Sequence, residues 1–468
     1  MSAGTGTSAH SIRLLAEWTL ASAPVYRSPL VLRQARLLLL DTLGCAIIGA
    51  RAPTAQSVRA LVDALGGNPE CTLIGARGRT SVINAALANG VAVRNLDFND
   101  VMFIQKEGRL SVGGHCSDTI PAALAVAERA GSPWEDVLQS VVVGYQLFGR
   151  LRDVMPFSSV WDGASSCGLV AAAMAGRLMR LTGEAQAHAL SLAAIRCATP
   201  KVVRWGSLSS AKNIASSLIA CAGVEGALLA SYGLTGPPEV LDHPGGMGAV
   251  FDKALGLEQL WAPPPVVPQI MAANVKTYAC IGTAQTLAAA ALDMYGRLEA
   301  PLGEIASIDV VMADLPMVRN QQAEANRQMP RTREDADHSF SYIPVAALRD
   351  GELGERQFEN ERWLDPEARQ LTAKVRLMTS AALRDKAPSS MPCRLVVRLQ
   401  SGAEIATECL YPPGHSFPDK GLDESVVTAK FRAVTAHALT ADTSARIIDW
   451  TMTAKGNAPL RDLFTLLT

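Results

Sequence analysis

The chain has 468 residues, 49% of them hydrophobic, and its 43 Lys and Arg against 44 Asp and Glu leave a formal net charge of -1. This length predicts two or three domains, and the balanced charge excludes a bulk attraction to nucleic acid or an anionic membrane, so we expect a small-molecule ligand. The nine cysteines form no CxxC pair, which disfavours a disulfide framework, a zinc site and an iron–sulfur cluster. We find no signal-peptide pattern and no apolar run of ~20 residues, so we expect a cytoplasmic protein without a membrane span.

Helices are predicted for most of the first 235 residues. Apolar side chains recur at helical spacing over residues 29–50, and shorter Ala-rich helices are expected over residues 54–65, 81–93, 119–130, 133–154, 165–181, 184–195 and 212–234. Small side chains allow helices to approach closely, and only 5% of the residues are aromatic. The sequence therefore predicts tightly packed helices around a common centre.

The composition changes at three consecutive prolines, residues 263–265, where we place a domain boundary. Beyond one more Ala-rich helix, residues 280–295, strands are predicted over residues 307–312, 373–378, 394–399 and 405–410, the last two forming a hairpin. Helices return at residues 423–439, at 441–452 and after 459. Residues 266–411 are thus expected to form a smaller α+β domain.

Residues 94–118 are the stretch that we consider richest in potential acid/base chemistry, which lies in the segments RNLDFND (94–100) and GGHCSD (113–118). We interpret this stretch as an active-site loop anchored by helices at both ends, with His115 facing a cavity. The alternative is a surface connection in which Asn99 and Asp100 make a turn while Ser117 and Asp118 cap the next helix. These residues alone do not decide between the two interpretations.

Other candidate groups lie further along the chain. Lys212 opens a helix, at the end where the helix dipole disfavours a cation, and Lys276 begins the helix after the proline-rich connection. Arg204 belongs to a cluster of cations that suits a ligand with several carboxylates. Residues 337–339, Asp-His-Ser, precede a helix, and capping explains them sufficiently.

Several chemistries are disfavoured. Cys116 with His115 as its base lacks a third orienting group, and His115 with Asp97 and Asp118 lacks the spacing of a known metal site. The sequence also has no GxxxxGK[ST], no GxGxxG after a strand and no GxSxG. Neither a nucleotide cofactor nor a metal is expected.

Five segments in order resemble the MmgE/PrpD family, which includes 2-methylcitrate dehydratase, cis-aconitate decarboxylase and iminodisuccinate epimerase. The segments NLDFND (95–100) and GHCSD (114–118) are similar to the family's LDFND or LDFDD and GHPSD. Residues 203–212 resemble RxGxLSxxK, and the similarity continues through residues 223–238 to Lys-Thr-Tyr at 276–278, which resembles KxYP. Each motif is weak alone, but their order is specific.

The resemblance implies a mainly α fold, with a large all-helical domain from residues 1–265 and 412–468 and an α+β lid from residues 266–411. It also implies a homodimer and a cofactor-free, metal-free site between the domains. By motif position Asp97, His115, Lys212 and Lys276 would be catalytic, as base, general acid/base and carboxylate-holding or proton-donating cations. We further expect the substrate to be bound by Arg94, Ser117, Arg204 and Tyr278.

Three positions depart from the family pattern. Val101 replaces a common threonine, Cys116 replaces the proline of GHPSD, and a second family histidine is missing from residues 160–164, Val-Trp-Asp-Gly-Ala. Either Asp162 acts in place of that histidine or the chemistry differs. We expect a lyase that dehydrates a 2-methylcitrate-like hydroxy acid. The alternatives are an epimerase, isomerase or decarboxylase on a related acid, or a catalytically silent paralogue that only binds a carboxylate.

Overall fold

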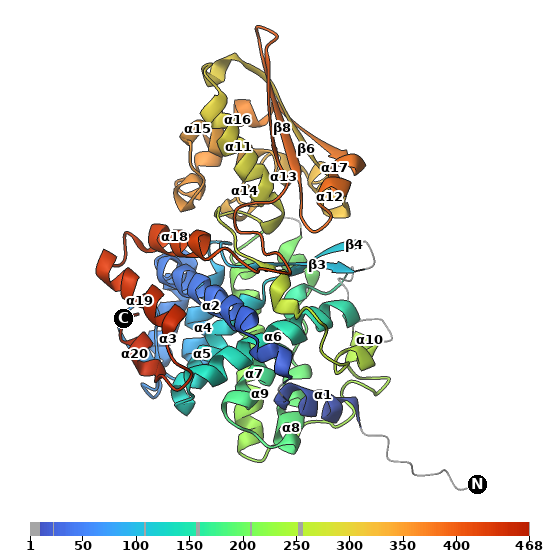
Figure 1. Ribbon diagram of the computed structural model, residues 1–468, viewed down its shortest axis with the longest axis vertical. Helices are drawn as coiled ribbons and strands as arrows, with labels where there is room; N and C mark the ends of the chain where they lie inside the picture. The colour runs from blue at the N-terminus through green and yellow to red at the C-terminus, as the bar shows by residue number, and fades with distance from the viewer. Residues whose placement is uncertain are drawn as a thin grey trace, which may run out of the picture.

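The computed structural model describes residues 10–21, 23–106, 109–155, 160–205, 208–250 and 256–467. Figure 1 shows two lobes: a larger one made mostly of helices, and a smaller one, residues 278–411, which contains a sheet and which we call the lid. The predicted mainly α fold with an α+β part is confirmed. Gly206 and Ser207, in the segment that resembles RxGxLSxxK, lie outside the described residues.

The larger lobe is built around α9 (Ala211–Ser231), which packs against α4, α7 and α8. Its other long helices are α1 (Ser11–Leu20), α2 (Pro29–Gly49), α3 (Pro53–Leu65), α4 (Val82–Arg94), α5 (Ile120–Ala130), α6 (Trp134–Val154), α7 (Cys167–Leu178) and α8 (Gly183–Ala194). Small residues allow these helices to touch, as predicted: a Cβ atom added to Gly223 on α9 would lie 2.3 Å from the carbonyl oxygen of Gly168 on α7. Among the described residues α9 alone is long and apolar enough to cross a membrane, and most of it is buried among its neighbours, as in the core helix of a globular domain.

The end of the chain returns to this lobe as α18 (Glu424–Thr435), α19 (Ala441–Thr453) and α20 (Leu460–Phe464). Helices α18 and α19 pack against α2. Lys430 of α18 is buried, pairs with Asp41 of α2, and donates a hydrogen bond of 2.7 Å to the carbonyl oxygen of Phe98. The C-terminal helices therefore brace the segment that carries Asp97.

Residues 94–118 are not the continuous loop that the sequence suggested. Strands β3 (Val101–Lys106) and β4 (Arg109–Gly114) form an antiparallel hairpin, and β3 also pairs with β5 (Ala273–Asn274). The hairpin lies on the side of the helical lobe that faces the lid (Figure 1). A second short strand pair, β1 (Cys71–Thr72) with β2 (Arg79–Thr80), shows that this lobe is helical in its bulk rather than throughout.

The lid contains a four-stranded sheet in the order β7-β6-β8-β9. Strands β6 (Ile305–Ala313) and β7 (Val375–Ser380) are parallel, while β8 (Cys393–Leu399) pairs antiparallel with β6 and with β9 (Glu404–Cys409). The four predicted strands, including the hairpin, are confirmed. The lid helices are α11 (Gln285–Arg297), α12 (Pro316–Ala323), α13 (Ala325–Gln328), α14 (Arg333–Ala336), α15 (Tyr342–Asp350), α16 (Pro366–Thr372) and α17 (Ala381–Lys386).

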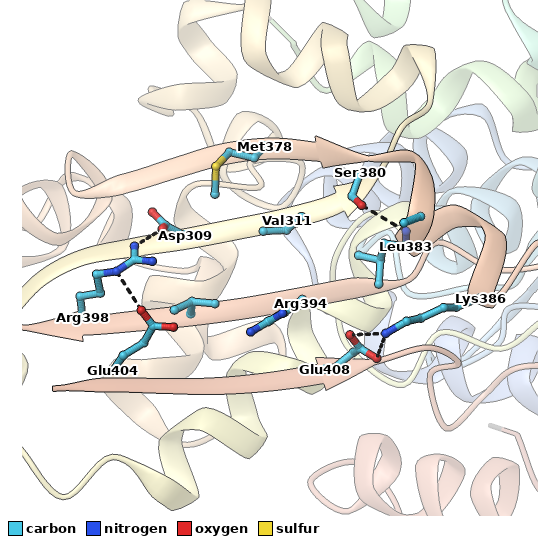
Figure 2. Close-up of a pocket in the computed structure, with 12 residues that line it drawn as sticks. Asp309, Val311, Met378, Ser380, Leu383, Lys386, Arg394, Arg398, Glu404 and Glu408 are labelled. Atoms are coloured by element: carbon cyan, nitrogen blue, oxygen red, sulfur yellow. Dashed lines mark hydrogen bonds and ion pairs between the residues drawn. The ribbon is translucent and has the colours of Figure 1, made fainter.

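The two faces of this sheet differ. Alternate apolar residues such as Val310 and Leu395 join a core that includes α11 and α15. The other face carries a hollow of about 370 Å³. Figure 2 shows two sets of ion pairs there: Arg398 lies between Asp309 and Glu404, and Lys386 contacts Glu408 at 2.9 Å.

Candidate active site

A cavity of about 430 Å³ lies between the two lobes. The helical lobe contributes Arg94, Asp97, His115, Arg204 and Lys212 to its wall, among others, and the lid contributes Gln321, Arg327 and His338. Apolar side chains such as Val101, Phe148, Ile281 and Met317 also line it. This mixture of apolar surface and a few convergent polar groups is typical of a site for a small molecule.

Asp97 is the centre of the polar network. Its buried carboxylate accepts a hydrogen bond of 2.5 Å from Arg94, contacts Lys276, and lies 3.3 Å from Lys212 Nζ. Burial alone would raise the pKa of Asp97, but the charges of Arg94, Lys276 and Lys212 outweigh this effect and hold the pKa well below its usual range. Asp97 is therefore an ionised anchor for the surrounding cations and a poor base.

The backbone of Asp97 adopts a left-handed conformation, with φ at +49°. For a residue with a side chain this conformation costs roughly 1–2 kcal/mol, so other contacts must hold it. Lys276 supplies them: its fully buried ammonium donates to the Asp97 carbonyl oxygen at 2.7 Å and also to the carboxylate. Lys276 follows β5 in a connection, whereas the sequence suggested that it begins a helix; the next α-helix starts at Gln285.

His115 follows β4, and its ring is fixed by the backbone. Its Nδ1 contacts the carbonyl oxygen of Asp100, which can only accept, so Nδ1 carries the proton and Nε2 is left with a free lone pair, 4.0 Å from Asp97 Oδ1. Burial, and then the positive charges of Arg94 and Lys276, hold the pKa of His115 well below its usual value. His115 is thus a neutral imidazole whose Nε2 can accept a proton.

Asp100, whose carbonyl oxygen contacts the His115 ring, is buried. Its carboxyl group accepts hydrogen bonds from the Ser117 hydroxyl and, at 2.8 Å, from the Tyr145 hydroxyl. Burial raises its pKa to about 7, although these two hydrogen bonds act in the opposite direction. The contacts fix the segment whose carbonyl group selects the tautomer of His115.

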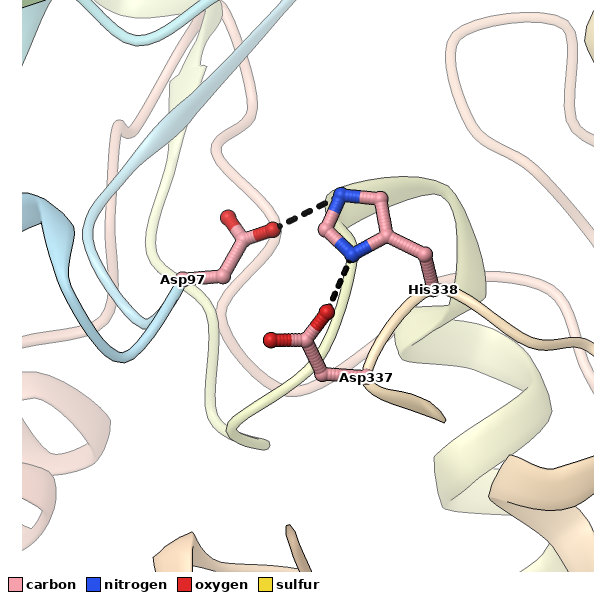
Figure 3. A group of neighbouring side chains, drawn as sticks. All are labelled: Asp97, Asp337 and His338. Carbon is pink, nitrogen blue, oxygen red and sulfur yellow. Dashed lines mark hydrogen bonds and ion pairs between the residues drawn. The ribbon is translucent and has the colours of Figure 1, made fainter. Parts of the chain in front are cut away.

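The lid brings a second histidine to the site. Figure 3 shows the His338 ring between two carboxylates: its Nε2 lies 3.0 Å from Asp97 Oδ2, and its Nδ1 contacts Asp337. Burial, followed by the charge of Lys212, lowers the pKa of His338 to about 4. Asp337 and His338 come directly after α14, so this contact joins the lid to Asp97.

Lys212 lies beside carboxylates of both lobes. Its ammonium is fully buried at the start of α9 and lies 3.3 Å from Asp97, 3.5 Å from Asp337 and 3.3 Å from His338 Nδ1. Burial lowers the pKa of Lys212, against the two carboxylates. A buried ammonium with a lowered pKa can stabilise a developing negative charge or release a proton.

Asp162 and Arg204 form a pair in another part of the wall. Both carboxylate oxygens of Asp162 accept from Arg204 Nε, at 3.0 and 2.9 Å, and one also accepts from the Ala164 backbone N–H. This engagement favours a role for Asp162 in positioning Arg204. It does not favour the role of proton carrier in place of the missing family histidine.

Asp97, Asp337 and His338 lie close enough together to be considered as metal ligands. Their charges argue otherwise, because Lys212 contacts both carboxylates, Lys276 contacts Asp97 and Arg333 lies 3.4 Å from Asp337. A divalent cation would have to displace ammonium groups already buried there. This donor set does not fit a metal ion.

Two family models match the chain: the MmgE/PrpD N-terminal domain over residues 13–259 and the MmgE/PrpD C-terminal domain over residues 278–454. The chain belongs to the MmgE/PrpD family. Its relatives include a cis-aconitate decarboxylase of Homo sapiens, 25% identical over 443 residues, which cover 89% of this chain and 86% of the relative. A cis-aconitate decarboxylase of Aspergillus terreus is 23% identical over 83% of this chain and 82% of its own length. A probable 2-methylcitrate dehydratase of Saccharomyces cerevisiae is 25% identical, over 84% and 79% respectively.

The MmgE/PrpD motifs bring most of the predicted site residues together. Arg94, Asp97, His115, Asp162, Arg204 and Lys212 line the cavity, while Lys276 lies behind Asp97 and supports it. Two residues expected to contact the substrate do not line this cavity. Ser117 is fully buried between Asn99 and Asp100, and Tyr278 packs against the core of the lid.

The sequence interpretation missed Asp337 and His338, which it assigned to capping. That assignment holds for the neighbouring Ser339, whose hydroxyl accepts a hydrogen bond of 3.0 Å from the Tyr342 backbone N–H at the start of α15. The adjacent Asp and His were the available signal, since a histidine next to an acid before a helix can face inward. Only the docking of the lid on Asp97 shows where the ring lies.

Proposed function

We propose that the protein is a cofactor-independent hydro-lyase that acts on a small polycarboxylate, with a 2-methylcitrate-like hydroxy acid as the first candidate. The observation that carries the proposal is that two imidazoles, those of His115 and His338, and the buried Lys212 ammonium line a single cavity. Removal of a hydroxyl group next to a carboxylate needs a base for the carbon-bound proton and a donor for the leaving oxygen. This site offers both.

In the proposed reaction, His115 Nε2 takes the proton from the carbon next to a carboxylate. The electron pair that remains forms an enolate-like charge, which the Lys212 ammonium stabilises. The carbon–oxygen bond then breaks, and Lys212 delivers a proton to the departing hydroxyl group, so that an alkene and water are formed. Asp97 keeps these groups in place and does not exchange a proton itself.

A decarboxylase is the second candidate, because several relatives that match over most of their length are cis-aconitate decarboxylases. Loss of carbon dioxide requires a cation that stabilises the carbanion and a proton donor, and Lys212 can supply both. The free lone pair of His115 has no necessary part in that reaction, which is why we rank dehydration first. The proposal also includes a homodimer, which light scattering on the purified protein would measure.

The test is incubation of the purified protein in D2O with 2-methylcitrate, citrate or cis-aconitate. Alkene absorbance without carbon dioxide supports the hydro-lyase, and release of carbon dioxide supports the decarboxylase. Deuterium exchange without either product supports an epimerase. Saturable binding without turnover on a broad panel of acids would reject every enzymatic version. Parallel reactions with His115→Ala separate catalysis by this site from a contaminating activity.

A further inference from the structure

Arg327 of α13 is a buried cation with an unused donor in the cavity wall. Only 7% of the residue is exposed, and its Nε lies 3.3 Å from Glu324 Oε2. Its Nη1 is buried and has no hydrogen-bond partner among the described residues. A buried charged donor without an acceptor destabilises a protein by about 1–3 kcal/mol, so this nitrogen requires an acceptor that the described residues do not supply.

The position of Arg327 is tied to that of the catalytic lid segment. The Arg327 carbonyl oxygen accepts a hydrogen bond from the Ser339 hydroxyl, next to His338. Gln321, which also lines the cavity, donates to the His338 carbonyl oxygen at 2.8 Å. The guanidinium and the imidazole are therefore held by the same part of the lid.

The hollow on the open face of the lid sheet (Figure 2) offers a contrast. There Arg398 and Lys386 form ion pairs with acidic neighbours, and both side chains are about half exposed. Arg327 differs because it is buried and its Nη1 has no hydrogen-bond acceptor among the described residues. Arg327 also lines the interdomain cavity, so an external anion bound there would lie beside its guanidinium.

We propose that Arg327 binds a carboxylate of the substrate that is distinct from the carboxylate next to the reacting carbon. A planar guanidinium suits a carboxylate because its N–H groups match the two oxygens. The inference rests on the proposed function, in which Lys212 and His115 act beside the first carboxylate. It narrows the substrate class to acids with at least two carboxylates that span from the helical lobe to the lid.

The experiment measures binding by calorimetry with a ladder of unreactive acids: butyrate, glutarate and tricarballylate, which carry one, two and three carboxylates. For the wild type we expect affinity to rise along the ladder. In Arg327→Gln the gain from butyrate to tricarballylate should shrink by about 10- to 100-fold, the range for losing a hydrogen bond between charged groups. Arg331→Gln is the matched control, since Arg331 is a nearby exposed arginine, and it should bind like the wild type.

The outcomes separate the two proposals. If the wild type binds the acids and Arg327→Gln keeps the full gain, the assignment of Arg327 is overturned while the proposed function stands. If the wild type neither binds nor converts any acid, the proposed function itself fails. Arg327→Lys retains the charge without the planar guanidinium and is the test variant if Arg327→Gln does not fold. It should keep part of the rise in affinity from butyrate to tricarballylate. A rise equal to that of the wild type would reject the role of the guanidinium.

Discussion

Replacement of Lys276 by methionine should destabilise the protein far more than the loss of an exposed lysine. The side chain is fully buried and holds Asp97 at two points, its carbonyl oxygen and its carboxylate. Methionine has a similar length but no charge, so the variant leaves a buried carboxylate with fewer cations and a left-handed residue without its clamp. Removing one partner of a buried ion pair typically costs 3–5 kcal/mol.

The structure places the expected value at the lower end of that range. Asp97 keeps Arg94 at 2.5 Å and Lys212 at 3.3 Å, and the variant no longer has to bury the Lys276 ammonium. We therefore expect the free energy of unfolding to fall by about 3 kcal/mol. Turnover should fall as well, because Asp97 positions Lys212 and His338.

The measurement is urea unfolding followed by circular dichroism, with Lys386→Met as the matched control. Lys386 pairs with Glu408 on the open face of the lid sheet, where both side chains are substantially exposed, and such pairs contribute about 0–1 kcal/mol. Equal midpoints for the two variants would refute the reasoning. In a double-mutant cycle Lys276→Met and Asp97→Asn should be non-additive, since both remove the same contact.

Four further predictions concern the site. His115→Ala and Lys212→Ala should each lower turnover by at least ~100-fold, measured as initial rates, and near-wild-type rates in either would reject its assignment. Because the His115 imidazole stays neutral, the wild-type rate should hold through pH 6.5 and fall only well below it; an acid limb centred at 6.5 would contradict this. The pKa of Asp100 is raised to about 7 in the folded state, so this group contributes stability that is present below pH ~4 and lost as the pH rises through 7. Between pH 4 and pH 8 the free energy of unfolding of Asp100→Asn should therefore rise by up to about 4 kcal/mol relative to that of the wild type. Parallel pH dependences of the two unfolding free energies would contradict this. Dialysis against EDTA should leave activity unchanged, because the carboxylates near Lys212 are already neutralised.

The helices and the lid strands were predictable because their signals are local. Helix α6 is an example: its apolar spacing predicted residues 133–154, and the helix spans Trp134–Val154. The β3–β4 hairpin was missed although Val101, Met102, Phe103 and Ile104 form a run with strand character. Part of its pairing comes from β5, some 170 residues further on, and such a distant partner leaves no periodic pattern in the nearby sequence.

The candidate site divides in the same way. Four site residues could be predicted because each lies in a short segment that resembles an MmgE/PrpD motif: Asp97, His115, Lys212 and Lys276. The sequence could not show that Asp162 is engaged by Arg204, or that His338 faces Asp97, because both facts depend on how distant segments meet. Helix capping was an adequate local explanation for Asp337 and His338, and only the packing of the lid shows that the His338 ring lies beside Asp97.

The packing of the lid places a histidine of another segment in the site that lacks the family histidine. The wall where it was expected holds the Asp162–Arg204 pair, which is engaged internally, while the lid supplies His338 at 3.0 Å from Asp97. If His338 completes the proton-transfer set, the set exists only while the lid is docked, because His115 and Lys212 belong to the helical lobe. Catalysis would then depend on a substrate that holds both lobes together, and a second carboxylate bound by Arg327 would do so.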